Sequence, residues 1–434
     1  MTEKQILPQS VPLDMRLVYK RNMGGYEEWL IEYTAEGADT WPERAGRKVP
    51  AYVLVPEGRS KPPYPAMLCN HQCNVDCHLG KEVVVGKVVD RPDQAFGLEL
   101  VRQGFVVLAP DGLFCGQRNI PEMRKEGEAK PCFDDVKRFL HRDWEQKLRD
   151  DGIRAVDLLA SLDFVDKQRI GVIGHSGGSF GALVTMAADK RIKAGIISGR
   201  TRDWDAKRFS PIAPRLLIIL NGLLDGATED IERTSTGVTE VMSEYREAGA
   251  EDNLILRTHK CGHHFIDEFK WFAYRRLKEH FGMQPVRKLT DLSHLLRNAR
   301  QLASWAWNND DSRFLPIPEH GGKVQVLVDE NMESALFRIF VHLTEKTPAD
   351  SSLSLEIDVN GDSAHVACSI PAGDDSVKVA HDYDDIRYCQ QVFSENHATW
   401  AREQSNTGLR YVLGFKCAEQ ERIEDNQQKD GGDA

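Results

Sequence analysis

The chain has 434 residues, of which 41% are hydrophobic and 28% charged. These values are ordinary for a globular protein, and they exclude both a disordered chain and a small protein that depends on disulfides or a metal for its core. The formal net charge is −11. A charge of this sign argues against nucleic acid or an anionic membrane as the main partner, whereas neutral or cationic small molecules fit it well.

The cysteines and the N-terminal residues bear on the cellular compartment. Nine cysteines are scattered along the chain, and an odd, dispersed set indicates free thiols rather than a disulfide framework. The first residues lack the apolar segment of a signal peptide, and no run of about 18 apolar residues could span a bilayer. We therefore expect a cytoplasmic protein.

The first two thirds of the chain alternate strand and helix patterns. Two β-rich segments, 26–34 and 48–55, predict an opening pair of antiparallel strands. Further strands are predicted at 66–69, 105–109, 169–174, 192–198, 215–222 and 254–258. Helices are predicted to end at Gly104 and to cover 136–162, 177–188, 237–248, 266–281 and 287–309. Nearly continuous apolar strands that alternate with helices are typical of a doubly wound, mostly parallel α/β sheet.

A turn-rich segment at 314–322 predicts a linker to a second domain. Beyond it, the patterns predict strands at 323–329, 353–359, 364–370 and 409–417, with helices at 331–346 and 382–403. This order is that of a ferredoxin-like α+β domain. The predicted domains are therefore 1–315, with a core of about 25–285, and 316–418, followed by a disordered tail at 419–434.

The strongest local signal is the segment 169–183, RIGVIGHSGGSFGAL. Gly174, Ser176 and Gly178 satisfy the pattern G-x-S-x-G between a buried strand and a helix, where a serine nucleophile is presented on a sharp turn. Residues on either side of such a turn must lack bulky side chains, and glycine meets that demand. We predict that Ser176 is a nucleophile.

A serine nucleophile requires a base and a group that orients the base, in the chain order Ser, Asp/Glu, His. Asp225 follows the strand LLIILNG, and we prefer it to Glu229 and Asp230 in the same loop because it comes first after the strand. His263 follows the strand LILRT, and His264 is its alternative. The predicted catalytic residues are therefore Ser176, Asp225 and His263.

Acyl transfer also needs N–H donors for the oxyanion. One candidate is the backbone N–H of Gly177, directly after the nucleophile. The other is the backbone N–H of Gln72 or Cys73, in the loop NHQCN after the strand PAMLC. Cysteine and histidine cluster in this loop, but their spacing is not that of a zinc site, so we predict no metal.

Together, PAMLCNHQ, GFVVLAPDGLFCGQR, the segment 151–178 and GHHF resemble the α/β-hydrolase superfamily. Within it, the chain looks like the dienelactone hydrolase and acetyl xylan esterase group. The resemblance implies a covalent acyl-enzyme mechanism without a cofactor. Two features depart from that group: Gln72 stands where a glycine is usual, and a domain is added after 315.

The sequence leads us to expect a serine hydrolase that cleaves a small ester, such as an acetyl ester, a lactone or a thioester. An amidase or peptidase with the same triad is one alternative, and a non-catalytic binding protein of the same fold is the other. We expect a small-molecule ester as the partner, with neither nucleic acid nor a membrane, and we regard the C-terminal domain as a candidate for homo-oligomer formation.

Overall fold

The computed structural model describes residues 11–37, 47–57, 61–72, 78–88, 91–119, 144–199, 209–225, 228–259, 262–284, 288–306, 324–329, 331–346, 352–371, 389–390, 392–405 and 408–417. The chain divides into two compact units, Met1–Met283 (unit 1) and Gln284–Ala434 (unit 2). The linker predicted at 314–322 and the tail predicted at 419–434 lie outside the described residues.

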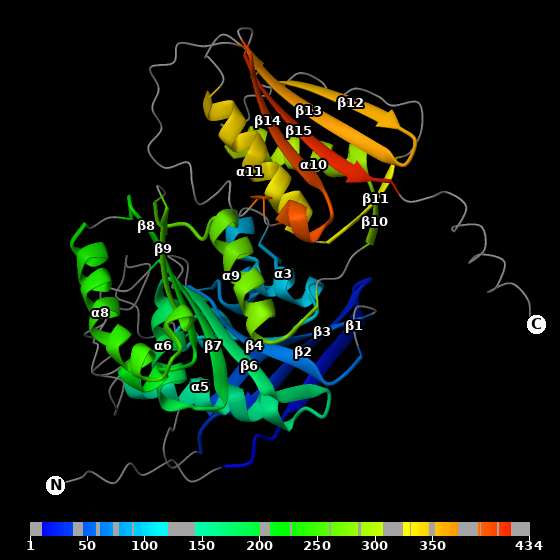
Figure 1. The fold of residues 1–434 in the computed structure, drawn as a ribbon. Helices are drawn as coiled ribbons and strands as arrows, with labels where there is room; N and C mark the ends of the chain where they lie inside the picture. Colours follow the sequence, from blue (N-terminus) through cyan, green and yellow to red (C-terminus); the bar gives the residue numbers. More distant parts are fainter. Residues whose placement is uncertain are drawn as a thin grey trace, which may run out of the picture. The chain divides into compact units, whose positions relative to one another are not determined.

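Unit 1 contains a nine-stranded sheet in the order β1-β2-β3-β5-β4-β6-β7-β8-β9 (Figure 1). The strands are β1 (Arg16–Asn22), β2 (Tyr26–Thr34), β3 (Lys48–Pro56), β4 (Tyr64–Asn70), β5 (Val106–Pro110), β6 (Val165–His175), β7 (Ile192–Ser198), β8 (Leu216–Gly222) and β9 (Leu254–His259). The first three are antiparallel to their neighbours, and β5 through β9 run parallel. The carboxyl ends of β4, β5, β6, β8 and β9 therefore meet at one edge of the sheet, where a doubly wound fold places its site.

Helices cover both faces of this sheet (Figure 1). They are α2 (Lys81–Val84), α3 (Phe96–Arg102), α5 (Trp144–Ser161), α6 (Gly177–Ala188), α8 (Thr228–Glu247) and α9 (Asp267–His280), with 3-10 turns η1 (Pro92–Gln94), η2 (Gly116–Arg118), η4 (Ser210–Ile212) and η5 (Glu251–Asn253). One core cluster joins α5, α6 and α8 to the sheet, and a second joins α2, α3 and α9 to its other face. This arrangement confirms the predicted doubly wound sheet.

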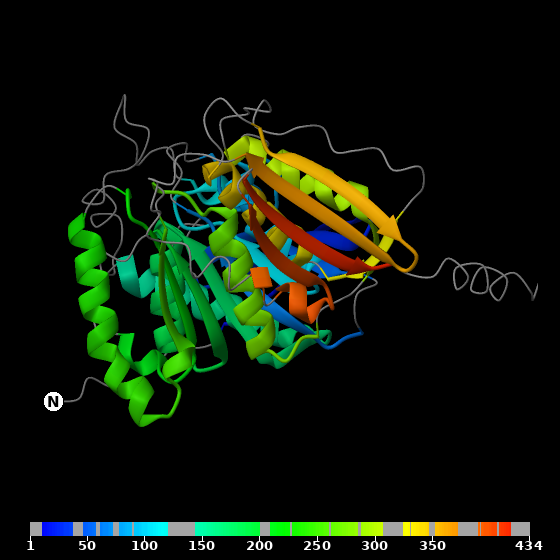
Figure 2. The ribbon, with the colours of Figure 1, turned by 45° about the horizontal axis from the view of Figure 1, so that its top comes forward.

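Unit 2 is a smaller α+β unit (Figure 2). Its elements are β10 (Lys288–Asp291), α10 (Leu292–Ala306), β11 (Gln325–Val328), α11 (Asn331–Lys346), β12 (Ser354–Asn360), β13 (Ser363–Pro371), β14 (Thr399–Ser405) and β15 (Gly408–Lys416). An antiparallel sheet in the order β12-β13-β15-β14 is accompanied by the pair β10-β11. Aliphatic side chains of α10 and α11, such as Leu296 and Leu336, are fully buried.

Unit 2 differs from the predicted ferredoxin-like domain in two respects. The boundary lies at 283/284 rather than 315, because β10 pairs with β11 and so ties residues 288–306 to unit 2. Residues 399–403, predicted as the end of a helix, belong to β14. His397 has a left-handed φ of 56°, which ends the short helical segment 392–395, and β14 then pairs with β15. The resulting strand order is not ferredoxin-like.

The turn between β6 and α6 holds Ser176 in an unusual conformation, with φ 55° and ψ −123°. The Ser176 N–H donates to the Ser198 carbonyl at 2.8 Å, and the Ser179 N–H donates to the Ser176 carbonyl at 3.0 Å. Glycines make the turn possible. A Cβ on Gly174 would lie 2.7 Å from the Ser179 nitrogen, and one on Gly178 would lie 2.6 Å from the His71 carbonyl oxygen. This is the turn that the G-x-S-x-G spacing predicts.

Two glycines of α6 should respond in opposite ways to alanine. Gly178→Ala should lower the free energy of unfolding by about 1–3 kcal/mol, because its Cβ meets backbone that cannot move aside. Gly181→Ala should raise it by about 0.5–1 kcal/mol, since the nearest atom, Asn70 Nδ2, is 3.5 Å away and alanine favours the helix. Urea unfolding of both variants measures the difference. Equal effects would contradict the packing described for Gly178.

Candidate active site

A hydrogen bond joins the loops that follow β8 and β9. His263 Nδ1 lies 2.7 Å from Asp225 Oδ2, and the two side chains are 44% and 20% exposed. Because a carboxylate only accepts, the proton of this bond resides on Nδ1, and Nε2 is left to accept a proton. The structure thus brings together the Asp and the His that the strand order predicts.

The alternatives to this pair are placed differently. His264 Nδ1 lies 3.9 Å from Asp93 Oδ2, so the His264 ring is directed toward Asp93 rather than toward Asp225. Glu229 and Asp230 lie in the first turns of α8, where the side chains are outside the described residues. Among the candidates whose side chains are described, Asp225 and His263 contact each other.

His175, the residue before Ser176, packs against the predicted base. Its ring centroid lies 4.8 Å from that of His263, and it stacks on Phe265 at 6.0 Å with an interplanar angle of 8°. His175 Nδ1 lies 3.0 Å from Ser198 Oγ. The carbonyl of the same residue, Ser198, accepts the hydrogen bond from the Ser176 N–H. His263 is therefore held beside the turn at Ser176 through His175, a contact that sequence reasoning missed.

Because Gly199 has no side chain, there is room beside it for the rings of His175 and His263. Gly199 has φ +75°, and a Cβ there would lie 2.7 Å from His175 Cε1 and 3.3 Å from His263 Cε1. Burial, together with the nearby His263, lowers the pKa of His175 to about 3. His175 is therefore neutral at pH 7 and does not bind a proton there.

The loop after β4 is anchored by His71. The Gly112 N–H donates to His71 Nε2 at 2.8 Å, so the proton of this ring is on Nδ1, which donates to the Gln72 carbonyl at 2.7 Å. Burial lowers the pKa of His71, in keeping with a neutral ring. Since the His71 carbonyl faces Gly178, the loop lies against the first turn of α6.

Gly177 and Gln72, two of the predicted oxyanion donors, are each adjacent in the chain to a residue of this contact. Gly177 is the first residue of α6, so its N–H has no partner within the helix, and the helix dipole favours negative charge there. Gln72 lies directly after the anchored His71. Cys73, the other candidate, lies outside the described residues. The loop and the helix N-terminus together can supply two donors to one oxyanion.

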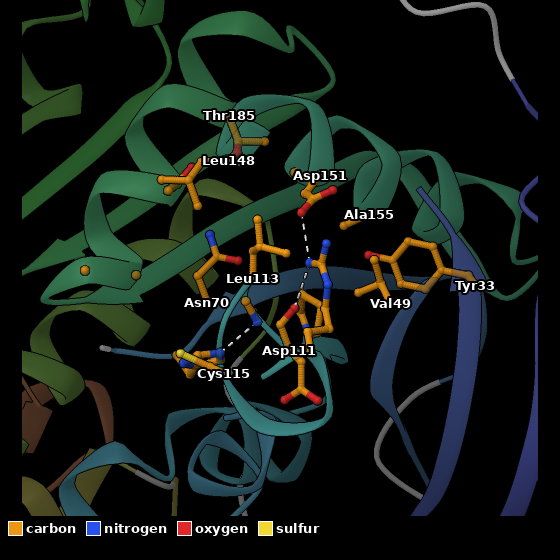
Figure 3. Close-up of a pocket in the computed structure, with 18 residues that line it drawn as sticks. Tyr33, Val49, Asn70, Asp111, Leu113, Cys115, Leu148, Asp151, Ala155 and Thr185 are labelled. Atoms are coloured by element: carbon orange, nitrogen blue, oxygen red, sulfur yellow. Dashed lines mark hydrogen bonds and ion pairs between the residues drawn. The ribbon is translucent and has the colours of Figure 1, made fainter. Parts of the chain in front are cut away.

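A cavity of about 80 Å³ opens beside this helix N-terminus (Figure 3). It is lined by Gly177 and Gly178 and extends between α5, α6 and strands β2 and β3. Its lining residues are Tyr33, Val49, Asn70, His71, Pro110, Asp111, Gly112, Leu113, Cys115, Arg118, Leu148, Asp151, Gly152, Ala155, Gly177, Gly178, Gly181 and Thr185. The cavity combines apolar side chains with buried charges.

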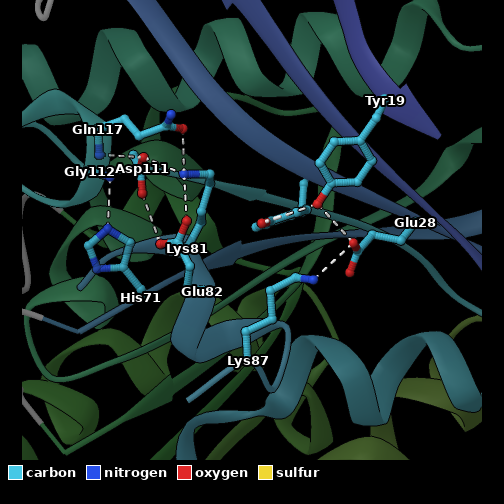
Figure 4. A network of polar contacts seen from close by, with 10 residues as sticks. Tyr19, Glu28, His71, Lys81, Glu82, Lys87, Asp111, Gly112 and Gln117 are labelled. Atoms are coloured by element: carbon cyan, nitrogen blue, oxygen red, sulfur yellow. Dashed lines mark hydrogen bonds and ion pairs between the residues drawn. The ribbon is translucent and has the colours of Figure 1, made fainter. Parts of the chain in front are cut away.

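Asp111, directly after β5, holds two loops together near the cavity (Figure 4). Its carboxylate is fully buried and accepts from Lys81 Nζ at 2.8 Å, from the Lys81 N–H at 2.9 Å and from the Gln117 N–H at 3.0 Å. A Cβ on Gly116 would lie 2.6 Å from the Asp111 Cγ, so the Gly-Gln-Arg turn must begin with glycine. The loops after β4 and β5 therefore share one buried ion pair.

A second set of charges forms the far wall of the cavity. Arg118 donates to the Asp111 carbonyl at 3.2 Å and to Asp151 Oδ2 at 2.8 Å, while Lys147 pairs with Glu36 at 2.6 Å and also with Asp151. Burial opposes the ionisation of Asp151, but Arg118 and Lys147 outweigh it and lower the pKa of this carboxyl. The wall is thus made of paired charges.

The described residues contain neither a metal-binding cluster nor a membrane-spanning helix. Within this part of the chain, no group of three or more His, Cys, Asp or Glu side chains is arranged to hold a metal ion. Nor is any helix among the described elements long and apolar enough to cross a bilayer.

Removing Lys81, the cation of the buried pair with Asp111, should lower the free energy of unfolding much more than removing Lys20, the cation of an exposed pair. Lys81→Met leaves the buried Asp111 carboxylate without its cation and should lower the free energy of unfolding by about 3–5 kcal/mol. Lys20→Met breaks a pair whose side chains are 46% and 26% exposed and should cost less than about 1 kcal/mol. Chemical denaturation compares the two. A loss at Lys81 as small as that at Lys20 would contradict the buried network.

Stability should depend on pH through His175. An unfolded histidine binds a proton below about pH 6.5, whereas the native ring, with a pKa of about 3, does not. The unfolded state therefore binds more protons, and the contribution of His175 should fall by about 2 kcal/mol from pH 7 to pH 5. The variant His175→Phe should lose this part of the slope in unfolding experiments across that range. An unchanged slope would show that the ring is not buried as described.

Comparison with known proteins agrees with the fold. Residues 135–215 match the prolyl oligopeptidase family, and this segment includes the turn at Ser176. Over 244 residues, the chain is 28% identical to YtaP of Bacillus subtilis (strain 168), which carries a provisional hydrolase name; the match covers 50% of this chain and 78% of YtaP.

Among solved structures, a provisionally named acetyl xylan esterase from Bacteroides fragilis is 18% identical, covers 59% of this chain and 71% of its own, and has a TM-score of 0.45. A glucuronoyl esterase from Solibacter usitatus is 15% identical and also has a TM-score of 0.45; the match covers 63% of this chain and 87% of the esterase. The sheet order, the turn at Ser176 and the family match together confirm the predicted α/β-hydrolase-like fold of unit 1 and the prediction of an enzyme of the hydrolase class.

Proposed function

We propose that unit 1 is a serine esterase that cleaves a small carboxylic ester, such as an acetyl ester, a lactone or a thioester. Ser176 is the nucleophile, His263 the base and Asp225 the group that orients the base. The observation that carries this proposal is the 2.7 Å bond between His263 and Asp225, held beside the strained turn of Ser176 by His175.

In the proposed reaction, Ser176 Oγ attacks the carbonyl carbon while its proton passes to His263 Nε2. The oxyanion is met by the Gly177 N–H and by a backbone N–H of Gln72 or Cys73. Collapse breaks the bond to the alcohol oxygen, which takes the proton from His263, and leaves an acyl-enzyme. A water molecule then gives its proton to His263 and attacks the acyl carbon, which releases the acid and restores Ser176.

Asp225 stabilises the imidazolium that forms in both halves of this sequence. It also holds the tautomer that leaves Nε2 free to accept the proton. His175 remains neutral, because of its low pKa, when His263 becomes positively charged. No cofactor enters these steps.

Amide hydrolysis by the same residues is the second candidate, and the match of residues 135–215 to the prolyl oligopeptidase family favours it. Cleavage of an amide differs in the leaving group, since His263 must protonate an amine rather than an alcohol. Matched ester and amide substrates with the same acyl group distinguish the two activities. The cytoplasmic location and a homo-oligomer formed through the C-terminal domain stay predictions from the sequence.

A fluorophosphonate probe should label the protein, and peptide mass should place the adduct on Ser176. Ser176→Ala should abolish labelling, and Asp225→Asn should lower kcat for an ester by about three to four orders of magnitude, because the base loses its orienting carboxylate. Ser243→Ala, which changes an exposed serine of α8, is the matched control and should label like the wild type. Failure of the folded wild type to label, or labelling at another serine, would overturn the proposal.

A further inference from the structure

Tyr33 of β2 is an exception among the buried tyrosines. It is fully buried, and its hydroxyl, which lies at the wall of the cavity, has no hydrogen-bond partner among the described residues (Figure 3). In contrast, the buried Tyr245 hydroxyl donates to the Arg215 carbonyl at 2.8 Å, and that of Tyr274 donates to Glu99 at 2.7 Å. Buried hydroxyls are normally satisfied in this way. The Tyr33 hydroxyl thus indicates a ligand that supplies the missing partner.

Burial raises the pKa of Tyr33, and the carboxylate of Asp151 raises it further. The phenol therefore keeps its proton and can donate it. The cavity wall includes the apolar side chains of Val49, Leu113 and Leu148, and two of the charges that it also holds, Arg118 and Asp151, are paired with each other. A ligand that enters here must be mainly apolar and must carry an oxygen that can accept from the hydroxyl.

The position of the cavity fixes which part of an ester can enter it. The alcohol must face His263 to receive a proton, and the carbonyl oxygen must face the Gly177 N–H. The remaining substituent of the carbonyl carbon, the acyl chain, then points away from His263. The cavity is lined by Gly177 and Gly178, the two residues after Ser176, whereas Ser176, His263 and Asp225 are not part of its wall. The cavity is therefore on the acyl side of Ser176.

We propose that this cavity binds the acyl portion of the substrate and that the Tyr33 hydroxyl donates to a hydroxyl oxygen on that acyl chain, so that short hydroxyacyl esters are the preferred substrates. This inference rests on the proposed function. At roughly 30 Å³ per water molecule, a volume of about 80 Å³ has room for about three water-sized groups, which limits the acyl chain to a few carbons.

A pair of aryl esters that differ in one group tests the role of Tyr33. The 3-hydroxybutyryl and 3-methylbutyryl p-nitrophenyl esters have nearly the same shape, and their kcat/KM values are corrected for their rates of alkaline hydrolysis. The wild type should favour the hydroxyacyl ester by about tenfold, the effect of one hydrogen bond. Tyr33→Phe should remove most of this preference.

Tyr245→Phe is the matched control, since it also removes the hydroxyl of a fully buried tyrosine. It should leave the preference unchanged and lower the melting temperature, because a hydrogen bond to Arg215 is lost. Tyr33→Phe should not lower the melting temperature, because its hydroxyl has no such bond within the described residues. This difference separates the role in binding from a general effect on folding.

Gly181→Ala provides a second, independent test. Its methyl group enters the cavity without a close contact, since Asn70 Nδ2 is 3.5 Å away. The kcat/KM for the branched butyryl esters should fall relative to that for the acetyl ester. An unchanged ratio would show that the acyl chain does not occupy the cavity.

The outcomes distinguish this inference from the proposed function. If Ser176 hydrolyses both esters but the corrected rates are equal and insensitive to Tyr33→Phe, the acyl assignment is overturned and the esterase proposal stands. If the folded protein hydrolyses no ester and Ser176 takes no probe, the proposed function fails and the acyl assignment fails with it.

Discussion

The site depends on one contact that only glycine allows, the approach of Gly178 to the carbonyl groups of Asn70 and His71. It brings the end of β4 against the first turn of α6, so that N–H groups from two distant segments can point at the same atom. The same contact supports the strained conformation of Ser176, two residues before it. The turn at Ser176 and the end of β4 are therefore positioned together, and a side chain at 178 would move them apart.

From this contact, hydrogen bonds extend the positioning to neighbouring loops. His71 joins the loop after β4 to Gly112, and the adjacent Asp111 is held by Lys81 and by the backbone of Gln117. Loops at the edge of a sheet are otherwise the least constrained parts of such a fold. A buried carboxylate with a single cation has few acceptable geometries, so the ion pair fixes these loops more narrowly than apolar packing would.

The sequence predicts the strongly periodic elements and the order of the proposed triad, because both are local patterns. It fails where structure depends on distant partners. β1 is almost wholly exposed and shows no alternation of buried and exposed residues. β10, which begins at Lys288, is defined by its pairing with β11, which begins only at Gln325. The bond that anchors His71 is made to Gly112, after β5, and Tyr33 lies at the wall of a cavity that α5 and α6 also line, so neither role can be derived from neighbouring residues in the sequence. The second oxyanion donor, the backbone N–H of Gln72 or of Cys73, stays a prediction.

The two sides of Ser176 differ in their exposure to water. On the side of the base, His263 is 44% exposed, and Leu223 and Leu224, just before Asp225, are 44% and 64% exposed. On the other side, the cavity ends at Tyr33, which is fully buried. Hydrolysis of an acyl-enzyme requires water at the base, whereas the oxyanion donors act more strongly where water is excluded. If Ser176 reacts as proposed, the exposed side near His263 accepts alcohols of many sizes. The substrate is then selected by its acyl chain, which must fit the buried cavity that ends at Tyr33.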